Sequence, residues 1–504
     1  MMAVADTRSR PQFEGGASSS VPLQPPPRMS PLRIPLLAAV LLLGSASTGL
    51  AQRGAASSAI NIPFERMTLP NGLKVILAPD RTVPQVAVNI YYHVGSKNEI
   101  PGRTGFAHLF EHVMFTGSGH VPYGLHDRLT SGVGGTNNGT TNNDRTNYYE
   151  VVPSNYLESA LWLESDRMGF LLDKLDEAKF AAQRDIVQNE RRQGVDNQPY
   201  GRSFELLDFA MIPSSHPYSW PVVGYMTDLK AATVGDVKGF FRQYYAPSNA
   251  TMSIVGDFSP AEARTLVRKY FGDLPRGKAI VRPRVPLVSL QGEKRITYED
   301  RVQVPRLYLA WPTVPERHAD NAALTFLGQI LAGSRTARLT KPLVYDKQSA
   351  SNVVAASGTA EDIGRFLVII TPRPGNSLSA LEASTDSIIA RLKQEGPTAD
   401  ELAKASAGVE FAFISALQSN LGKSNILNDG MVFYNNPAHY KRQYAELKAV
   451  TAADIKRVAN RYLGAGRVVL SIVPLGKPDQ ASTPAASSIV TVAPDGAHYI
   501  MGTK

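Results

Sequence analysis

The chain has 504 residues, contains no cysteine, and is 43% hydrophobic and 19% charged. This composition is typical of a folded globular protein, and it excludes disulfides, thiol nucleophiles and cysteine-ligated metal sites, so any metal must be held by His, Asp and Glu. The 53 basic and 44 acidic residues give a net charge of +9 with no block of Lys or Arg, which argues against a nucleic-acid partner.

The first predicted element is a secretory signal peptide over residues 1–51. Arg28 and Arg33 precede an apolar run at residues 34–43, and small residues follow up to Gly49-Leu50-Ala51, which fits a small-x-small cleavage site. The apolar run is too short to cross a bilayer comfortably. Removal of the first 51 of the 504 residues would leave a mature chain of 453 residues.

We expect this mature chain in the periplasm. A mitochondrial transit peptide is the alternative, but Asp6, Glu14 and the aliphatic run count against it. Residues 1–28 are unusual in front of a signal peptide, and Met29 would be a natural start, so we interpret them as an over-extended reading frame. No later segment reaches 18 consecutive apolar residues, so we expect no membrane span.

The next predicted elements are two strands, at residues 74–78 and 86–92, and a helix at residues 105–116 with the sequence GFAHLFEHVMFT. His108 and His112 are four residues apart and share one face of this helix, with Glu111 beside them. Two neutral imidazoles at this spacing can bind one Zn²⁺, and a neighbouring carboxylate can take a proton from water. The pattern is H-x-x-E-H, the zincin motif in reverse order.

The alternative for this motif is a pair of core histidines. Burying two histidines and a glutamate without a partner is costly, so the metal site is favoured. A catalytic zinc site also needs a third protein ligand and one open position. The other seven histidines show no ligand spacing, which makes a carboxylate the better candidate.

A candidate third ligand lies in residues 177–193, which read as a helix. Glu190 falls on the inward-facing stripe of this helix, and a carboxylate aimed at a protein core needs a partner, which a zinc ion would supply. The pattern alone leaves an alternative open, since Glu190 could equally pair with Arg184 or Arg191.

The chain contains a diverged repeat. Residues 228–256 and 446–474 are identical at ten of 29 aligned positions without a gap. Each copy has a Thr before a helical pattern, as expected for an N-cap, and ends in a β-branched strand. Two unrelated helix–strand units could match by chance, but ten ungapped identities favour duplication.

Residues 274–292, rich in Pro, Gly and Arg, separate the two copies and read as a linker. We therefore predict an α/β (α+β) fold with two homologous domains, 57–273 and 293–476, each a mixed β-sheet packed with helices. The first domain carries the metal motif. Residues 477–504 are rich in Pro, Ser and Ala, and we expect them to form a flexible tail.

The sequence resembles the insulinase/pitrilysin family of zinc metallopeptidases, which includes the mitochondrial processing peptidases. The resemblance covers nearly the whole mature chain, and in the first half it includes residues 69–73, 108–112, 138–141, 144–149, 161–168 and 184–193. It implies two related α/β halves per chain, which together form half of a clamshell.

The resemblance also implies the site residues. The family's third metal ligand carries over to Glu190, 78 residues beyond His112, so that His108, His112 and Glu190 would hold one Zn²⁺ per chain. The family's general base carries over to Glu111. The implied activity is zinc-dependent endopeptidase cleavage of peptides or unfolded segments that enter a chamber.

A substrate-binding strand is implied at Asn138, Gly139 and Thr140, within a stretch rich in Gly, Asn and Thr. In the family this segment lies on an edge strand beside the metal, and such a strand can hold a peptide by β-addition. Gly139 stands where the family often has Ala. A solvated loop is the alternative.

The second half departs from the family pattern. Active members carry an Arg and a Tyr seven residues apart near the substrate carbonyl, but the aligned positions here hold Val344 and Ser351. Arg338 and Tyr345 are also seven apart, in the wrong register. The helix that corresponds to the motif, at residues 322–331, has no histidine, so this half is expected to be a degenerate copy with a structural or substrate-holding role.

We therefore expect a heterodimer, in which a homologous subunit supplies the Arg/Tyr pair; a homodimer with altered substrate contacts is the alternative. A non-catalytic binding or assembly subunit of the same family is the rival function. Such relatives usually lose the metal motif, whereas this chain keeps His108, Glu111 and His112 as well as Glu190.

Overall fold

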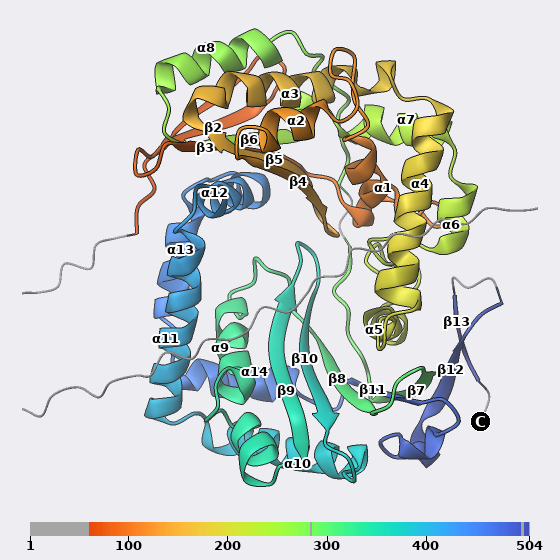
Figure 1. The fold of residues 1–504 in the computed structure, drawn as a ribbon. Helices are drawn as coiled ribbons and strands as arrows, with labels where there is room; N and C mark the ends of the chain where they lie inside the picture. The colour runs from red at the N-terminus through yellow and green to blue at the C-terminus, as the bar shows by residue number, and fades with distance from the viewer. Residues whose placement is uncertain (1–59, 283–284, 495–497, 503–504) are drawn as a thin grey trace, which may run out of the picture. The chain divides into compact units, whose positions relative to one another are not determined.

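The computed structural model describes residues 60–282, 285–494 and 498–502. The expected signal peptide at residues 1–51 and the over-extended start at 1–28 lie outside these residues. Two mixed β-sheets packed with helices make up the described chain (Figure 1). The predicted fold class is confirmed.

The first sheet has the strand order β1-β2-β6-β3-β5-β4. Its one parallel pair is β2 with β6, and its other neighbours are antiparallel. The strands are β1 (Glu65–Thr68), β2 (Lys74–Pro79), β3 (Gln85–Tyr92), β4 (Thr136–Thr141), β5 (Thr146–Pro153) and β6 (Ala250–Gly256).

The second sheet has the order β13-β12-β7-β11-β8-β10-β9. Its strands are β7 (Lys294–Asp300), β8 (Arg306–Thr313), β9 (Ala350–Thr359), β10 (Gly364–Pro372), β11 (Val468–Pro474), β12 (Ser488–Val492) and β13 (Tyr499–Met501). The run β7-β11-β8-β10-β9 repeats β2-β6-β3-β5-β4 in chain order and in every parallel or antiparallel pairing. The two halves are therefore homologous copies of one topology.

The repeat detected in the sequence forms equivalent elements in the two halves. Helices α7 (Val234–Tyr244) and α14 (Ala452–Tyr462) begin after Thr233 and Thr451, and each Thr hydroxyl accepts a hydrogen bond from the third residue of its helix. Both caps are full capping boxes, closed by an aspartate side chain. The strands that follow, β6 and β11, lie inside their sheets and are buried.

The remaining α-helices of the described chain complete the two layers. They are α1 (Phe106–Val113), α2 (Leu125–Ser131), α3 (Leu157–Phe170), α4 (Glu177–Arg191), α5 (Ser203–Met211), α6 (Met226–Ala231), α8 (Pro260–Phe271), α9 (Asn321–Ala332), α10 (Leu378–Glu395), α11 (Ala399–Ala416), α12 (Asn420–Tyr434) and α13 (His439–Lys448). None of these described helices is both long and apolar enough to cross a membrane.

One helix of each half packs against the sheet of the other half. Leu206 and Leu207 of α5 pack in one cluster with Tyr308 and Val468 of the second sheet. Conversely, α12 lies against β3 and β6 of the first sheet, where Leu427 is fully buried (Figure 1). The apolar surface of each sheet is therefore covered partly by the other half.

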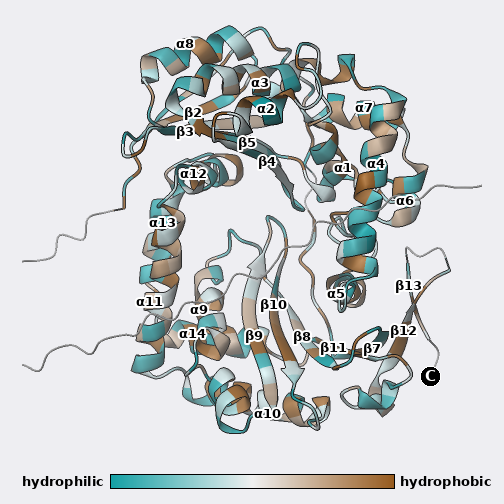
Figure 2. Ribbon diagram, in the orientation of Figure 1, coloured by the Kyte–Doolittle hydropathy of each residue, from teal (hydrophilic) through white to brown (hydrophobic). Residues whose placement is uncertain are grey.

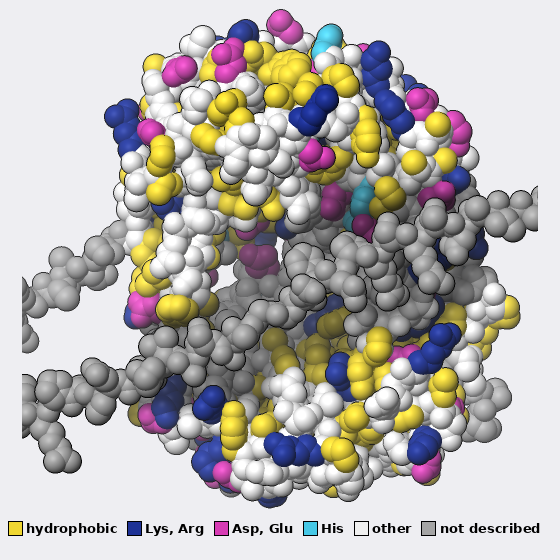
Figure 3. Space-filling view, viewed as in Figure 1, with side chains coloured by type: hydrophobic (Ala, Val, Ile, Leu, Met, Phe, Trp, Pro, Cys, Tyr) yellow, Lys and Arg dark blue, Asp and Glu magenta, His cyan; other side chains and the backbone are white. Residues whose placement is uncertain are grey.

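Hydrophobic residues lie along strands inside both sheets, β3 and β10 among them (Figure 2). Each sheet has its own apolar cluster on the face that carries its own helices. On the molecular surface, basic and acidic side chains are interspersed in the view of Figure 3.

The segment after Gly476 is not the loosely held tail that its composition suggested. Strand β12 pairs in parallel with β7, and β13 pairs antiparallel with β12. Val490 and Tyr499 are only 1% and 8% exposed. The prediction of a flexible tail was wrong because the edge of β7 offers unpaired backbone groups. A short strand can pair with them even when the residues around it are rich in Pro and Ser.

Candidate metal centre

Helix α1 carries the H-x-x-E-H motif and is anchored at its first turn. It begins after Gly105, which has a φ of +86° and no side chain to cap the helix. The buried carboxylate of Glu99 takes over this role by accepting hydrogen bonds from the backbone N–H groups of Gly105 and Ala107, at 2.9 and 2.8 Å. The helix is shorter than the predicted 105–116, since it ends at Val113.

The helix buries one face and leaves the motif on the other. Phe106, Leu109, Phe110 and Val113 are buried in the core of the first half. The side chains of His108 and His112 are 18% and 19% exposed, and their ring centroids lie 4.9 Å apart. The apolar face thus fixes both imidazoles on the open side of the helix.

Helix α4 brings Glu190 to the two histidines. Glu190 Oε2 lies 3.2 Å from His112 Nε2 and 3.6 Å from His108 Nε2. One ligand atom from each of the three residues lies within 4.8 Å of the others. The side chains of the three predicted ligands therefore meet in space, although Glu190 lies 82 positions after His108 in the sequence.

The donor set fits a zinc ion. Two imidazoles and one carboxylate are ligands that zinc takes in catalytic sites, where a fourth position stays open. Burial, followed by the neighbouring His112, lowers the pKa of His108 to about 4. The imidazole of His108 is consequently neutral at pH 7, as metal binding requires.

The alternative partners of Glu190 are engaged elsewhere. Arg191 is fully buried and donates to Glu205 Oε1 and to the carbonyl of Gly224, both at 2.8 Å. Arg184 donates to the carbonyl of Ala232 at 3.3 Å. Neither of these arginines forms an ion pair with Glu190 among the described residues.

Glu111 lies between the metal triangle and β4. A Cβ atom built on Gly139 would lie only 2.9 Å from Glu111 Cγ, so the absence of a side chain at residue 139 leaves room for this glutamate. Burial raises the pKa of Glu111, while a hydrogen bond with Thr141 and the charge of His112 act in the opposite direction. A carboxylate in this position can exchange a proton with water at the candidate metal site.

Strand β4 is an edge strand and carries the expected substrate-binding residues. It pairs with β5 and ends the strand order of the first sheet. Asn138 and Thr140 are exposed and Gly139 is buried against Glu111. The segment is therefore a strand beside the metal centre and not the solvated loop that was the alternative.

Sequence reasoning missed the residues that join α1 to α4. The loop at Gly224, whose carbonyl binds Arg191, lies against Gly105 at the start of α1. Glu205 of α5 holds the other side of Arg191 and accepts a hydrogen bond from Tyr499 of β13 at 2.6 Å. These residues come from four distant segments, so no local pattern could have revealed them.

A second acidic cluster in the described chain already surrounds a cation. Asp144, Glu361 and Asp362 bring three carboxylate oxygens together. However, Lys97 Nζ lies 3.0, 2.7 and 2.8 Å from them, and His93 adds a further contact to Glu361. The ammonium group occupies the place that a metal ion would take.

The second half holds no counterpart of the metal motif. Helix α9 contains no histidine, Val344 lies in a π-helical turn at Lys341–Asp346, and Ser351 lies on β9. The out-of-register Arg338 is held by Glu401 and by the carbonyl of Gly396. The positions aligned with the Arg/Tyr pair thus carry neither cation nor phenol.

Comparisons with known proteins agree with this division. The family model of the insulinase family, peptidase family M16, matches residues 74–212, and a model described as the peptidase M16 inactive domain matches residues 231–409. The zinc protease PqqE of Helicobacter pylori is 31% identical over 430 residues, which cover 84% of this chain and 95% of that protein. The uncharacterized zinc protease YmxG of Bacillus subtilis is 25% identical over 361 residues, or 71% of this chain and 86% of that protein.

Solved structures agree as well. The crystal structure of a protease from Helicobacter pylori has a TM-score of 0.76 and 29% identity, and the match covers 82% of this chain and 100% of that one. A peptidase M16 inactive domain from Pseudomonas fluorescens shares the fold, with a TM-score of 0.72 and 21% identity over 82% of this chain and 98% of the other. The chain belongs to peptidase family M16, the insulinase family.

Proposed function

We propose that this chain is a zinc-dependent endopeptidase that hydrolyses peptides or unfolded segments. The observation that carries the proposal is the convergence of His108, His112 and Glu190 within 4.8 Å, with Glu111 beside them. Similarity to proteins named zinc proteases supports it.

In this mechanism His108, His112 and Glu190 would hold one zinc ion per chain. When bound, the zinc would supply Lewis-acid chemistry that polarises the scissile carbonyl and acidifies water. Glu111 takes a proton from the attacking water as general base and then delivers a proton to the leaving amine. The hydrogen bond with Thr141 and the packing against Gly139 hold the Glu111 carboxylate for both steps.

The substrate is held on β4 by β-addition. The free edge of this strand offers backbone groups to an extended peptide. It carries Asn138, Gly139 and Thr140, of which Gly139 lies against Glu111. Backbone recognition of this kind favours unfolded segments, because a folded substrate has no free strand to add.

We further propose that a homologous subunit completes the site as a heterodimer. Val344 and Ser351 stand at the positions of the Arg/Tyr pair, so this chain does not itself supply the cation and phenol near the substrate carbonyl. A homodimer with altered contacts is the alternative, and a non-catalytic assembly subunit is the rival function.

The test measures zinc content and peptide cleavage together. We expect about one zinc per chain, and cleavage of an unstructured peptide that chelation abolishes and added zinc restores. Addition of a homologous subunit that carries the Arg/Tyr pair should increase the rate. The non-catalytic role would be favoured if the protein binds no zinc at equimolar level. It would also be favoured if the protein binds zinc but cleaves no peptide, both alone and with the homologous subunit.

A further inference from the structure

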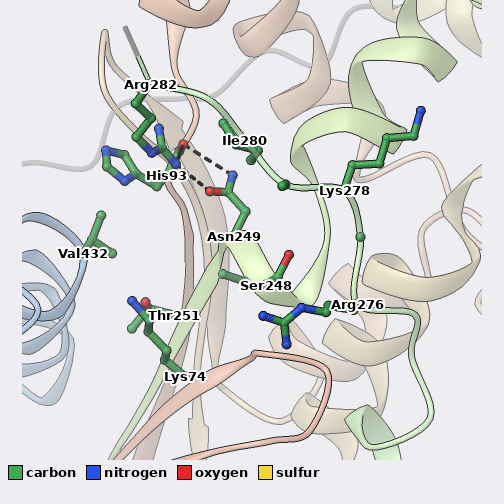
Figure 4. A pocket seen from close by; sticks show the side chains of 13 residues that line it. Lys74, His93, Ser248, Asn249, Thr251, Arg276, Lys278, Ile280, Arg282 and Val432 are labelled. Carbon is green, nitrogen blue, oxygen red and sulfur yellow. Dashed lines mark hydrogen bonds between the residues drawn. The ribbon is translucent and has the colours of Figure 1, made fainter. Parts of the chain in front are cut away.

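A basic pocket lies apart from the metal centre, where the linker after α8 passes the first sheet and α12. It has a volume of about 350 Å³. Its walls come from the starts of β2 and β6, from the residue after β3, from linker residues 276–282 and from Val432 of α12 (Figure 4).

The charged side chains that line this pocket are all basic or imidazole groups. Lys74, Arg276, Lys278 and Arg282 contribute to the wall, together with His93, and no Asp or Glu does. Among the described residues none of the four Lys and Arg side chains has an ion-pair partner. Nearby Lys97, by contrast, is surrounded by three carboxylates.

The two arginines are held in place by neutral acceptors. Arg282 donates to the carbonyl of His93 at 2.9 Å and to Asn249 Oδ1 at 2.7 Å. Arg276 donates to the carbonyl of Pro70 at 3.3 Å. These bonds position the guanidinium groups without neutralising them, and each group keeps further N–H donors.

The positive groups lie at separate places along the pocket. Figure 4 shows Arg282 beside His93, Arg276 beside Ser248, and Lys74 beside Thr251, whereas Lys278 extends away from them. Three separated positive groups suit a ligand that carries several acids along a chain better than one compact anion.

The charged forms of two of these side chains are destabilised in the pocket. Burial, and then repulsion from Arg282, lowers the pKa of Lys74. Burial likewise lowers the pKa of Arg282, although Glu361 and Asp362 act in the opposite direction. An anion in the pocket would stabilise the charged forms of both side chains and so oppose this lowering of their pKa values.

We propose that this pocket is an exosite that binds the carboxylates of an acidic peptide segment, and that the segment belongs to the substrate. Arg276 and Arg282 bind separate carboxylates through charge-assisted hydrogen bonds, and Lys74 provides a third positive group. The substrate role rests on the proposed peptidase function, whereas the binding itself does not.

The binding experiment needs no catalysis. A Glu111→Gln chain is titrated with a triglutamate peptide by calorimetry at an ionic strength of about 0.15 M. Arg276→Gln, added to this background, should weaken binding about tenfold or more, because hydrogen bonds to charged groups are the strong ones. Lys74→Gln is a second variant with the same expectation.

Arg81→Gln is the matched control. Arg81 is 78% exposed and follows the end of β2 opposite to Lys74, so its removal lowers the net charge equally and should leave the affinity unchanged. Equal weakening by Arg81→Gln and Arg276→Gln would overturn the site, since it would indicate binding to the overall charge. Binding of inorganic phosphate at Arg276 without binding of the peptide would overturn the peptide assignment.

The substrate role is tested in the active chain with two peptides that differ only by an acidic extension. Arg276→Gln should raise the KM for the extended peptide several-fold with kcat unchanged, and leave the neutral peptide unaffected. If the triglutamate peptide binds but the extension does not change KM, the exosite does not serve the substrate. If nothing is cleaved, the peptidase proposal fails while the binding result stands.

Discussion

At the scale of single residues, the position of Glu111 depends on what surrounds it. Gly139 on β4 leaves the space that the glutamate occupies, Thr141 hydrogen-bonds to it, and burial raises its pKa. The same side chain lies next to His112 and thus beside the metal triangle. Its position is therefore suited to proton transfer.

Glu111→Gln tests this assignment, because glutamine keeps the shape of the side chain and loses the ability to accept the proton. We expect zinc content to stay the same and kcat to fall by about 10²-fold or more. Glu177→Gln, at the exposed first turn of α4, is the control and should behave as the wild type. Full activity of the Glu111 variant, or loss of its zinc, would contradict the role of general base.

Arg191 acts next to a proposed ligand without being one. Its buried guanidinium ties the end of α4 to Glu205 and to the carbonyl of Gly224, and the Gly224 loop lies against Gly105 at the start of α1. The bond network thus sets the distance between the helix with Glu190 and the helix with the two histidines.

Arg191→Met should lower the free energy of unfolding by about 3 kcal/mol, since it leaves the Glu205 carboxylate buried without its cation, with only the hydrogen bond from Tyr499. Zinc affinity should fall as well, because α4 loses its anchor beside Glu190. Urea titration and zinc titration measure the two effects. Arg192→Met changes the adjacent, exposed arginine, and equal stability of the two variants would disprove the anchor.

At the scale of elements, α12 is held on the first sheet by an ion pair as well as by its apolar face. Lys423 of α12 binds Asp80, which follows β2. Hydrogen bonds from Lys423 and then Thr82 lower the pKa of Asp80 to about 2 from its usual 3.8. Both partners are only about one-fifth exposed.

This pair predicts a pH-dependent stability. Because the pKa of Asp80 is lower in the folded state, its contribution is complete above about pH 4 and is lost as the pH falls towards 2. Asp80→Asn should cost about 1 kcal/mol or less at pH 7, since solvent screens a partly exposed pair. The cost should shrink as urea titrations are repeated at lower pH.

The control for Asp80→Asn is Asp257→Asn. Asp257 faces the mostly exposed Arg81 at 3.9 Å, a pair from which little stability is expected. A cost for Asp80→Asn that stays constant down to pH 2 would show that the ion pair with Lys423 is not its source.

At the scale of the whole molecule, the two halves are joined by α5 and α12, each of which packs against the sheet of the other half. Leu207 of α5 is fully buried in the cluster of the second sheet, and Leu427 of α12 in that of the first. Each half therefore depends on the other to bury part of its apolar surface. Burial of apolar surface is the main favourable term in folding.

We therefore expect that residues 52–292, expressed alone, will not unfold cooperatively in urea. This fragment exposes the apolar face of α5 and lacks α12 over β3 and β6. Co-expression with residues 293–504 should restore a complex with one sharp transition, followed by circular dichroism. A cooperative transition of the first fragment by itself would show that this packing between the halves is not required.

The sequence by itself determined whatever depends on local geometry. His108, Glu111 and His112 share one side of α1 because residues four apart on a helix lie on one face. Thr233 and Thr451 cap equivalent helices because an N-cap needs only a side-chain oxygen next to the first turn. The duplicated topology also followed, since the two copies kept ten identical positions.

Only the tertiary structure decided which partner each polar group takes. Glu190 faces the two histidines, whereas the next residue, Arg191, binds Glu205 and the carbonyl of Gly224. The pairing of β12 with β7, the packing of α5 and α12 against the sheets of the opposite halves, and the basic pocket at the linker arise in the same way. Contacts between distant segments are set by the packing of whole elements, which no local spacing of residues records.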